Sequence, residues 1–333
     1  MSFRDLLRPV VSAQLMVQLA REHGLPIEQC LSNTGIAAET LQDSEAEIRT
    51  DQEIQLTRNL VAGLPHVPAL GLEAGLRYSV SSFGLWGFAI LSSRTIREAL
   101  GVAMRYHGLT FEFSRVFVSE AGGVTRLVFD DAETPEDLRV FCLERSLGST
   151  ARIRRELTGA VLPMTGLRLR MKRPAYEARL VEACGVVPEY GAPDNSYVIE
   201  PARLDMPIAF GNATVARQVE ADCRALLERR RHREGLAARV RDAVLKAPGQ
   251  IPPLDAVASG LNMTARTLRR RLAGENTSYR ELVEEVRRTL AQELLKAGRM
   301  KMEEVAERLG YSDATSFAHA FRRWEGRAPR ELR

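Results

Sequence analysis

The sequence lacks the residue patterns that mark most enzymes. Its five histidines lie singly, at positions 23, 66, 107, 232 and 319, so no two are spaced as metal ligands or a catalytic pair. The chain contains no G-x-S-x-G nucleophile motif, no H-E-x-x-H metal motif and no glycine-rich phosphate loop. We therefore predict no catalytic residues and no enzyme activity. A catalytic interpretation would begin with His107, but an isolated histidine near a helix end usually has a structural role.

Cysteines and long apolar runs are equally scarce. The four cysteines are far apart, with no C-x-x-C motif and no histidine pair nearby, which argues against a zinc site and a disulfide framework. We expect buried or inert thiols, no metal and no cofactor. No apolar run approaches the ~18 residues of a membrane span, and the start M-S-F-R-D-L-L lacks the layout of a signal peptide. These absences predict a cytoplasmic protein that does not contact a membrane.

The C-terminal part of the chain contains one helix-turn-helix pattern twice. The pattern V-A-x-x-L at Val257 recurs 48 positions later at Val305. In each copy the valine and the leucine share one helix face, and the small alanine lets a partner helix approach closely. Asn262 and Gly310 then supply residues that tolerate a left-handed turn. The alternative, an ordinary solvated helix hairpin, suits a single copy better than two copies in register.

Each turn is followed by a second short helix with one outward face. Thr264 in the first copy, and Ser312 or Asp313 in the second, can accept backbone N–H groups at the helix start. The outward residues of the first helix, which reads A-R-T-L-R-R-R-L, are Arg266, Thr267, Arg269 and Arg270. Those of the second, which reads D-A-T-S-F-A-H-A-F-R-R-W, are Ala314, Thr315, Ala318 and His319. Near the end of the second helix, Arg322 and Arg323 are placed for phosphates.

The two outward faces predict different roles on double-stranded DNA. The planar fork of arginine matches guanine O6/N7 or a phosphate, whereas the second face offers methyl groups to thymine and few hydrogen bonds. Between the units, Ser278 to Ala297 has the apolar spacing of a long amphipathic helix. Such a helix spans about 30 Å, and successive major grooves on one face of DNA lie about 34 Å apart. One chain can therefore occupy two adjacent grooves.

The charge distribution agrees with this assignment. Residues 226–333 hold 23 Lys and Arg against 15 Asp and Glu, a balance of +8, while residues 1–225 hold 24 against 28, a balance of −4. A basic module joined to a mildly acidic one fits a protein that binds DNA at one end and something else at the other.

Residues 236–333 resemble the DNA-binding domain of AraC/XylS-type bacterial transcription regulators. The resemblance rests on T-L-R-R-R-L in the first unit and on the closing A-x-x-L-G-Y-S-D-x-x-S-F-x-x-A-F-R-R-W-x-G-x-x-P-R-x-x-R. It implies an all-α domain of two helix-turn-helix units, promoter DNA and RNA polymerase as partners, and base contacts from the two outward faces. The second face departs from family members that carry long polar side chains there.

The pattern of the first 225 residues predicts an α+β domain. Helices come first, and they are followed by a small antiparallel sheet that is crossed by helices. The predicted helices lie near Leu19, over Ile27 to Leu31, from Ser93 or Thr95 towards His107, over Pro135 to Leu157 and over Ala175 to Cys184. The predicted strands are Phe111 to Ser119, Val124 to Asp130, Leu167 to Lys172 and two short strands within Glu189 to Ile199, with Gly122-Gly123 as a hairpin turn. Residues 226–235 are expected to form a basic linker to a DNA-binding domain at 236–333.

The string F-G-L-W-G-F-A-I-L-S-S-x-T-I-R-E-A-L, starting at Phe83, resembles the arabinose-binding-type N-terminal domain of AraC-type regulators that include ornithine-utilisation activators. The resemblance spans roughly residues 15–210 and implies a domain that senses a small effector or dimerises. An effector pocket should be mostly apolar with a few polar groups. The candidate lining residues are Phe83, Trp86, Phe88, Phe111 and Phe113, with Arg77 and Arg94 as anchors for an anionic ligand.

Two alternatives stay open in this domain. Glycine-spaced aromatics also occur where a core is simply tightly packed. Likewise, Arg152, Arg154 and Arg155 on the predicted long helix either meet an acidic ligand or a partner subunit, or face solvent.

The sequence therefore predicts a sequence-specific DNA-binding transcription regulator, an activator that responds to a small-molecule effector. The alternative is an effector-independent DNA-binding protein whose N-terminal domain only forms a homodimer.

Overall fold

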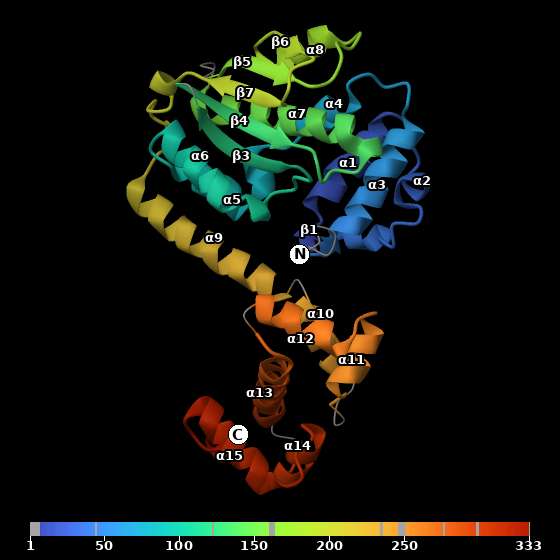
Figure 1. Cartoon of the computed structure of the whole chain (residues 1–333), viewed down its shortest axis with the longest axis vertical. Helices are drawn as coiled ribbons and strands as arrows, with labels where there is room; N and C mark the ends of the chain where they lie inside the picture. The colour runs from blue at the N-terminus through green and yellow to red at the C-terminus, as the bar shows by residue number, and fades with distance from the viewer. Residues whose placement is uncertain are drawn as a thin grey trace. The chain divides into compact units, whose positions relative to one another are not determined.

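A computed structural model describes residues 7–43, 45–121, 123–159, 164–233, 236–245, 251–275, 277–297 and 300–332. The chain divides into two compact units, residues 2–230 and 231–333 (Figure 1). Each unit has hydrophobic cores of its own.

The N-terminal unit begins with a layer of helices around one core. The helices are α1 (Val11–Glu22), α2 (Ile27–Leu31), α3 (Thr50–Gly63) and α4 (Leu70–Gly75). A short antiparallel ribbon is formed by β1 (Leu7–Pro9) and β2 (Glu47–Arg49). Met16, Leu19, Leu56 and Leu60 are fully buried because they recur on the inner faces of α1 and α3. The predicted helices in this part of the chain are confirmed.

A five-stranded sheet follows, with the strand order β3-β4-β7-β5-β6. Its strands are β3 (Arg115–Ala121), β4 (Val124–Asp130), β5 (Met164–Leu169), β6 (Pro188–Tyr190) and β7 (Ser196–Ile199). β3 and β4 form the predicted hairpin, although Gly122 of its turn lies outside the described residues. The prediction of a wholly antiparallel sheet is wrong, because β6 runs parallel to β5. Helix α8 (Glu177–Cys184) connects these two strands and provides the crossover that a parallel pair needs.

The strand predicted from Phe111 begins only at Arg115. The Phe111 ring is buried and packs against Phe83, with 5.4 Å between the ring centroids. Its carbonyl oxygen accepts hydrogen bonds from Arg8 Nη1 at 3.0 Å and from Arg145 Nη2 at 2.8 Å. A carbonyl held in this way is not available to a neighbouring strand, so tertiary contacts override the alternating pattern here.

Three helices pack against one face of the sheet: α5 (Leu85–Ser92), α6 (Ile96–Arg105) and α7 (Arg139–Thr158). Leu127 and Phe129 of β4 point towards them and share a core with Leu147 of α7. Thr95 caps α6, as one of the two predicted caps. The long helix predicted from Pro135 starts later, because residues 136–138 form a 3-10 turn before α7.

Helix α9 (Ala213–Arg233) is the last element of the N-terminal unit, and the division between the two units falls within it, after residue 230. The predicted linker, residues 226–235, therefore begins as the last turns of a helix. Gly235, expected to lead into the next domain, lies outside the described residues.

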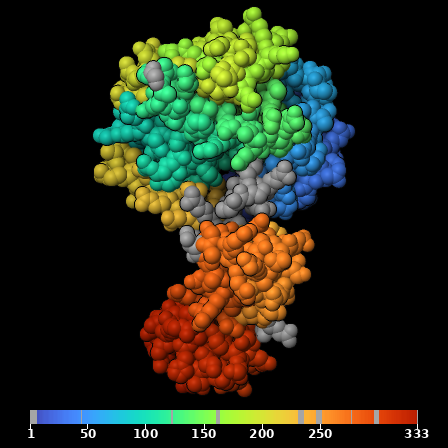
Figure 2. All heavy atoms as spheres, viewed as in Figure 1, coloured from blue at the N-terminus to red at the C-terminus, as the bar shows by residue number. Residues whose placement is uncertain are grey.

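All the regular secondary structure in the described part of the C-terminal unit is helical, as predicted. Its helices are α10 (Leu236–Leu245), α11 (Leu254–Gly260), α12 (Ala265–Gly274), α13 (Tyr279–Ala297), α14 (Met302–Arg308) and α15 (Ala314–Glu325). α10 to α12 build one core and α14 with α15 build a second, and α13 contributes residues to both. Figure 2 shows the atoms of α14 and α15, in red, packed closely together. The predicted connecting helix is thus α13.

Short 3-10 helices complete the described chain: η2 (Ala38–Gln42), η3 (Val80–Phe83), η4 (His107–Leu109), η5 (Glu136–Leu138), η6 (Pro201–Arg203) and η7 (Pro329–Leu332).

Candidate functional site

The first helix-turn-helix unit consists of α11, a tight turn and α12. Asn262 occupies the turn with φ of 55°, the left-handed conformation that the sequence predicted. Thr264 caps α12 by accepting the backbone N–H of Thr267 at 3.2 Å. Leu268 and Leu272 are fully buried on the inner face of α12. These contacts fix which side of the helix faces outward.

The outward side of α12 carries three exposed arginines, Arg266, Arg269 and Arg270. Within the described residues, none of their guanidinium groups forms an ion pair or a hydrogen bond. Thr267, the fourth predicted residue, is half-buried, and its hydroxyl lies 3.0 Å from that of Thr264. Thr267 therefore belongs to the helix cap, and the three arginines remain free for an external partner.

The second unit consists of α14, a turn and α15. Gly310 has φ of 73° in the turn, and Asp313 accepts the backbone N–H of Ser316 at 2.7 Å. The cap is therefore Asp313 and not Ser312, the other residue that the sequence allowed. Phe317 and Phe321 are fully buried, and their rings pack edge to face with centroids 5.8 Å apart.

The outward side of α15 is small and weakly polar. Thr315 and His319 are exposed, whereas Ala314 and Ala318 are half-buried. Arg322 is exposed and forms no ion pair among the described residues, while Arg323 lies 3.4 Å from the carboxylate of Glu284 on α13. The two arginines predicted to contact phosphates thus differ in their surroundings.

Helix α13 is attached to the second unit by contacts that sequence reasoning missed. Arg287 donates hydrogen bonds to the carbonyl oxygens of Leu309 at 2.9 Å and Gly310 at 3.0 Å. Its guanidinium also lies 4.5 Å from the centre of the Tyr311 ring, a cation–π contact. The residues are more than twenty positions apart in the chain, so no local pattern reveals them. Arg287 holds the turn that orients α15.

The first unit is anchored differently, through the end of its outward helix. The carboxylate of Glu275, directly after α12, accepts the backbone N–H groups of Leu236 at 3.1 Å and Ala237 at 3.0 Å. These groups open α10, where a carboxylate satisfies donors that the helix itself cannot. α12 is therefore fixed to α10 at one end.

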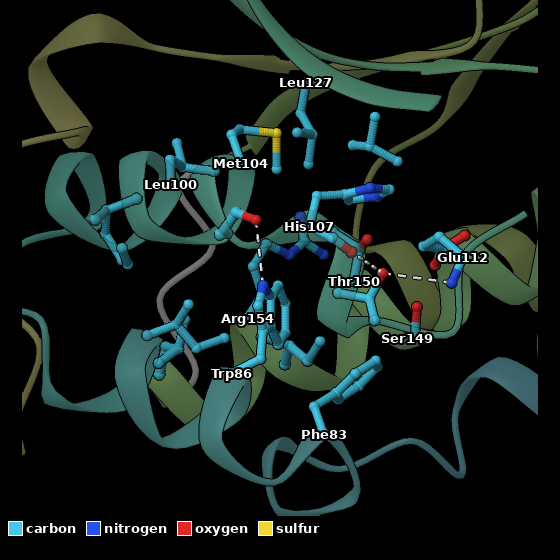
Figure 3. A pocket seen from close by; sticks show the side chains of 18 of the residues that line it. Phe83, Trp86, Leu100, Met104, His107, Glu112, Leu127, Ser149, Thr150 and Arg154 are labelled. Carbon is cyan, nitrogen blue, oxygen red and sulfur yellow. Dashed lines mark hydrogen bonds between the residues drawn. The ribbon is translucent and has the colours of Figure 1, made fainter. Parts of the chain in front are cut away.

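The N-terminal unit contains a cavity of about 110 Å³ between α5, α6, α7 and the sheet. In Figure 3, Phe83 and Trp86 lie on one side of it, with Leu100, Met104 and Leu127 on the opposite side. Trp86 donates its Nε1–H to the carbonyl of Ala103 at 3.2 Å, which fixes the indole in the wall. The cavity is mostly apolar, as expected of an effector pocket.

Two of the aromatic residues predicted for this pocket, Phe83 and Trp86, line the cavity. Phe111 lies behind Phe83 in the core, and Phe88 points away, with 48% of its surface exposed. The glycine spacing around them has a packing reason as well, because a Cβ on Gly87 would lie 1.9 Å from the carbonyl oxygen of Val80. Core packing and pocket lining therefore coexist in this string.

The two predicted anion anchors do not line the cavity. Arg77 donates to Glu22 at 2.9 Å and to Glu73 at 3.3 Å, so it already has two carboxylate partners. Arg94 is exposed and pairs with Glu98 four residues later in the chain. These contacts give both arginines roles on the surface of the unit.

The lining includes the polar residues His107, Thr110, Glu112, Ser149, Thr150 and Arg154 instead, and Arg154 and His107 carry its basic groups. Arg154 on α7 is only 5% exposed, whereas Arg152 and Arg155 on the same helix face solvent. Arg154 Nη2 donates to the carbonyl of Cys184 at 2.8 Å, and its Nε and Nη1 have no acceptor within the described residues. Burial lowers the pKa of His107 and so favours the neutral form of its ring. Helical periodicity would have indicated Arg154, because it lies three positions before the buried Leu157.

None of the helices in the described ranges combines the length and the apolar character needed to cross a bilayer.

Two family descriptions match the chain. The arabinose-binding domain of AraC transcription regulators, N-terminal, matches residues 24–208, and a helix-turn-helix domain matches residues 257–333. The first match covers the sheet, the cavity and most of the helical layer. The second covers both outward helices, α12 and α15.

Several known regulators are similar over the whole chain. An uncharacterised HTH-type transcriptional regulator of Mycobacterium tuberculosis is 33% identical over 98% of this chain and 96% of its own length. The ornithine utilization regulator of Pseudomonas aeruginosa is 30% identical over 100% of this chain and 98% of its own. The crystal structure of transcriptional regulator CdpR from Pseudomonas aeruginosa, 26% identical, covers 96% of this chain and 97% of its own, with a TM-score of 0.48.

Two helix-turn-helix units, the first with an exposed arginine face, attached to an α+β unit, define a DNA-binding transcription regulator. The chain belongs to the AraC family of HTH-type regulators, in the group with an arabinose-binding N-terminal domain.

Proposed function

We propose that this regulator binds double-stranded operator DNA by reading bases with Arg266, Arg269 and Arg270 of α12. The observation that carries the proposal is that these three arginines are exposed on one helix and have no partner among the described residues. A guanidinium is costly to leave without acceptors only when it is buried, so an exposed face of this kind is ready to donate to guanine or to phosphate. Each bidentate base contact contributes about 1–3 kcal/mol of discrimination.

The second outward helix has a supporting role in this proposal. Thr315, Ala318 and His319 offer methyl groups and few donors, so they discriminate weakly between base pairs. Arg322 contacts phosphate and sets the position of the protein on the duplex. Helix α13, with 19 residues, is about 29 Å long, which suits two units in grooves about 34 Å apart.

We propose further that the N-terminal unit senses a small-molecule effector and forms a homodimer, and that the protein activates transcription by contacting RNA polymerase in the cytoplasm, where its DNA lies. We infer a regulatory protein without catalytic activity, because within the described residues no hydroxyl group of the cavity lining is hydrogen-bonded to the His107 ring or to the Glu112 carboxylate; those of Thr110 and Ser149 donate to backbone carbonyl groups. The competing function is an effector-independent dimer. Supporting the effector hypothesis, the cavity lies inside the part of the chain that matches the arabinose-binding domain.

The DNA-binding proposal is tested by selecting operator sequences with the purified full-length protein and measuring affinities for single-base variants. Arg270→Ala should cost about 1–3 kcal/mol at particular base pairs and relax the preference there, whereas Arg322→Ala should weaken all sequences alike and reduce the salt dependence. The matched control is Arg271→Ala, which removes an exposed arginine from the flank of α12 opposite Arg269. If the folded protein protected no DNA sequence at low salt, the proposal would fail.

A further inference from the structure

Arg154 differs from Arg8 and Arg145, two other buried arginines of this unit, in forming no ion pair with a carboxylate among the described residues. Arg8 and Arg145 are both buried, and each forms an ion pair with Glu53, with N···O distances of 3.3 Å and 3.4 Å. Arg154 is buried to the same degree but has one hydrogen bond, from Nη2 to the Cys184 carbonyl, and a face-on contact with the Tyr197 ring at 5.0 Å. A buried cation without a counter-ion is costly unless something completes it.

The known contacts of Arg154 leave most of its donors unused. The bond to Cys184 satisfies a carbonyl at the end of α8, which is a structural role. Nε and Nη1 have no acceptor within the described part of the chain. Glu112, the acidic residue of the cavity wall, accepts a hydrogen bond from Ser146 and none from Arg154. Two nitrogen donors of the buried Arg154 guanidinium therefore have no hydrogen-bond acceptor among the described residues.

The space beside Arg154 is apolar and small. The wall of the cavity is built mainly from aliphatic and aromatic side chains, among them Trp86, Ile153, Leu157 and Met164. A cavity of about 150 Å³ in another protein holds benzene, so the 110 Å³ here suits a slightly smaller apolar group. His107 Nε2, which is also buried and has no hydrogen-bond partner in the described ranges, adds one further polar contact on the wall.

We propose that this cavity binds a small apolar monocarboxylate, with the carboxylate on Arg154 and an apolar body of about four to six carbon atoms among the hydrophobic side chains. The proposal rests on the effector-sensing function proposed above and names its ligand class. A sugar fits poorly, because most of its hydroxyl groups would be buried without partners. A diamino acid fits poorly as well, because its ammonium groups would lie near the Arg154 cation, and Glu112, the one carboxylate in the described lining, already accepts a hydrogen bond from Ser146.

The position of the cavity also suggests how binding is reported to the rest of the chain. Helix α9, which leads towards the DNA-binding unit, packs on the segment that forms one wall. Glu220 of α9 forms an ion pair with Arg105, and a methyl group of Leu227 lies 3.1 Å from the position of a Cβ on Gly108. Met104 and His107, which are adjacent to Arg105 and Gly108 in the chain, line the cavity. We therefore expect a ligand that displaces Met104 or His107 to displace the part of α9 that contacts this segment.

The test measures thermal unfolding of the full-length protein with matched probes. The acids are 4-methylpentanoate and pentanoate, and the uncharged controls are 4-methylpentanamide and pentanamide. At about 100 times its Kd, a bound acid should raise the Tm of the N-terminal unit by roughly 5–10 °C. The amides, L-arabinose and L-ornithine should leave Tm unchanged. Equal stabilisation by acid and amide, or stabilisation by arabinose or ornithine alone, would overturn the ligand class.

Variants separate the anchor from the fold. Arg154→Met should abolish the Tm rise, and the matched control Arg155→Met, on the exposed side of α7, should keep it. Since Arg154→Met also removes the bond to Cys184, Ala103→Leu provides a second variant, which fills the cavity and leaves Arg154 in place. Retention of the acid response in a folded Ala103→Leu protein would contradict the proposed site.

The same ligands distinguish this inference from the broader effector-sensing function. In a DNA-binding assay, a stabilising acid should change operator affinity, and Leu227→Ala should lose that change while keeping the Tm rise. If an acid stabilises the protein but leaves DNA binding unchanged in the unmodified chain, the site exists and the sensing function fails. If no acid of this size raises Tm, the ligand class fails, and screening of other metabolites still decides whether the unit senses an effector.

Discussion

The two helix-turn-helix units share a scaffold and differ in what they present to DNA. Counting from the observed caps, Thr264 and Asp313, buried leucines of α12 occupy the same places as buried phenylalanines of α15. On the outward faces, Arg266, Arg269 and Arg270 correspond to Thr315, Ala318 and His319. The two units therefore share the positions of their buried residues and differ in the residues of their outward faces.

The caps also reveal a difference of one residue between the units. The two V-A-x-x-L patterns are 48 positions apart, whereas the caps Thr264 and Asp313 are 49 apart. The second turn is therefore longer by Ser312, and it is also the turn that Arg287 holds by its carbonyl groups. We infer that the longer turn needs the two hydrogen bonds from Arg287 of α13 to keep its conformation.

The largest effect should come from the aromatic core of the second unit. Phe321→Ala should cost about 3–5 kcal/mol of unfolding free energy, because it leaves a cavity among Phe317, Tyr311 and Trp324. Trp324 lies in this core, so in a Trp86→Phe background its fluorescence follows chemical unfolding of the second unit in the full-length protein. Leu272→Ala in the first unit should leave the Trp324 transition nearly unchanged. If both variants move that transition equally, the two units unfold together and are not separable.

The second-largest effect should come from Arg287 of α13, which holds the second turn. Arg287→Met should destabilise the second unit by about 1.5–3 kcal/mol, because two carbonyl groups lose a charged donor. Amide hydrogen exchange should then increase in α14 and α15 and not in α12. Arg280→Met is the matched control, since Arg280 lies on the same helix and is 85% exposed. Faster exchange in α12 as well would show that Arg287 supports both units.

The difference between the outward faces should appear in base selectivity. Arg266 and Thr315 both follow their caps by two residues, so the substitutions Arg266→Ala and Thr315→Ala form a matched pair. Arg266→Ala should cost about 1–3 kcal/mol at its preferred base pair, and Thr315→Ala should cost less than about 0.5 kcal/mol. Affinities for a library of operator variants measure both. Similar losses for the two variants would mean that the second unit reads sequence as strongly as the first.

The smallest effect concerns pH and distinguishes a carboxylate cap from a hydroxyl cap. Hydrogen bonds from the backbone of Ser316 and from neighbouring hydroxyls lower the pKa of Asp313 below its usual 3.8. Its contribution to stability is therefore full above that value and is lost as the pH falls through the lowered pKa. Asp313→Asn should remove this part of the acid sensitivity of the second unit, measured as the difference in unfolding between about pH 5 and pH 2. Thr264 does not titrate, so Thr264→Ser should leave the acid profile unchanged.

Most of the secondary structure could be predicted, because it follows from short-range patterns. The left-handed turn residues, the cap at Thr264 and the connecting helix α13 all depend on neighbours within a few positions. The direction of β6 and the late start of β3 could not be predicted. Both depend on contacts far away in the chain, such as those that hold the Phe111 carbonyl.

The candidate sites divide in the same way. The arginine face of α12 follows from the helical period alone, since two buried leucines determine which side faces outward. The motif that starts at Phe83 predicted Phe83 and Trp86 as cavity residues, and both line the cavity. Arg77 and Arg94 were predicted there as well, but they form ion pairs with carboxylates outside it. Whether an arginine is free, paired or buried depends on which acidic side chains fold against it, and sequence spacing does not contain that information.

The sequence by itself therefore determined that this protein carries two helix-turn-helix units with unequal faces, because periodicity, turn residues and caps act over single turns of helix. Only the tertiary structure decided that Arg287 holds the second turn and that Arg154 is a buried cation beside an apolar cavity. These are outcomes of packing between segments distant in the chain, where burial and the choice of partner set the energy of each polar group.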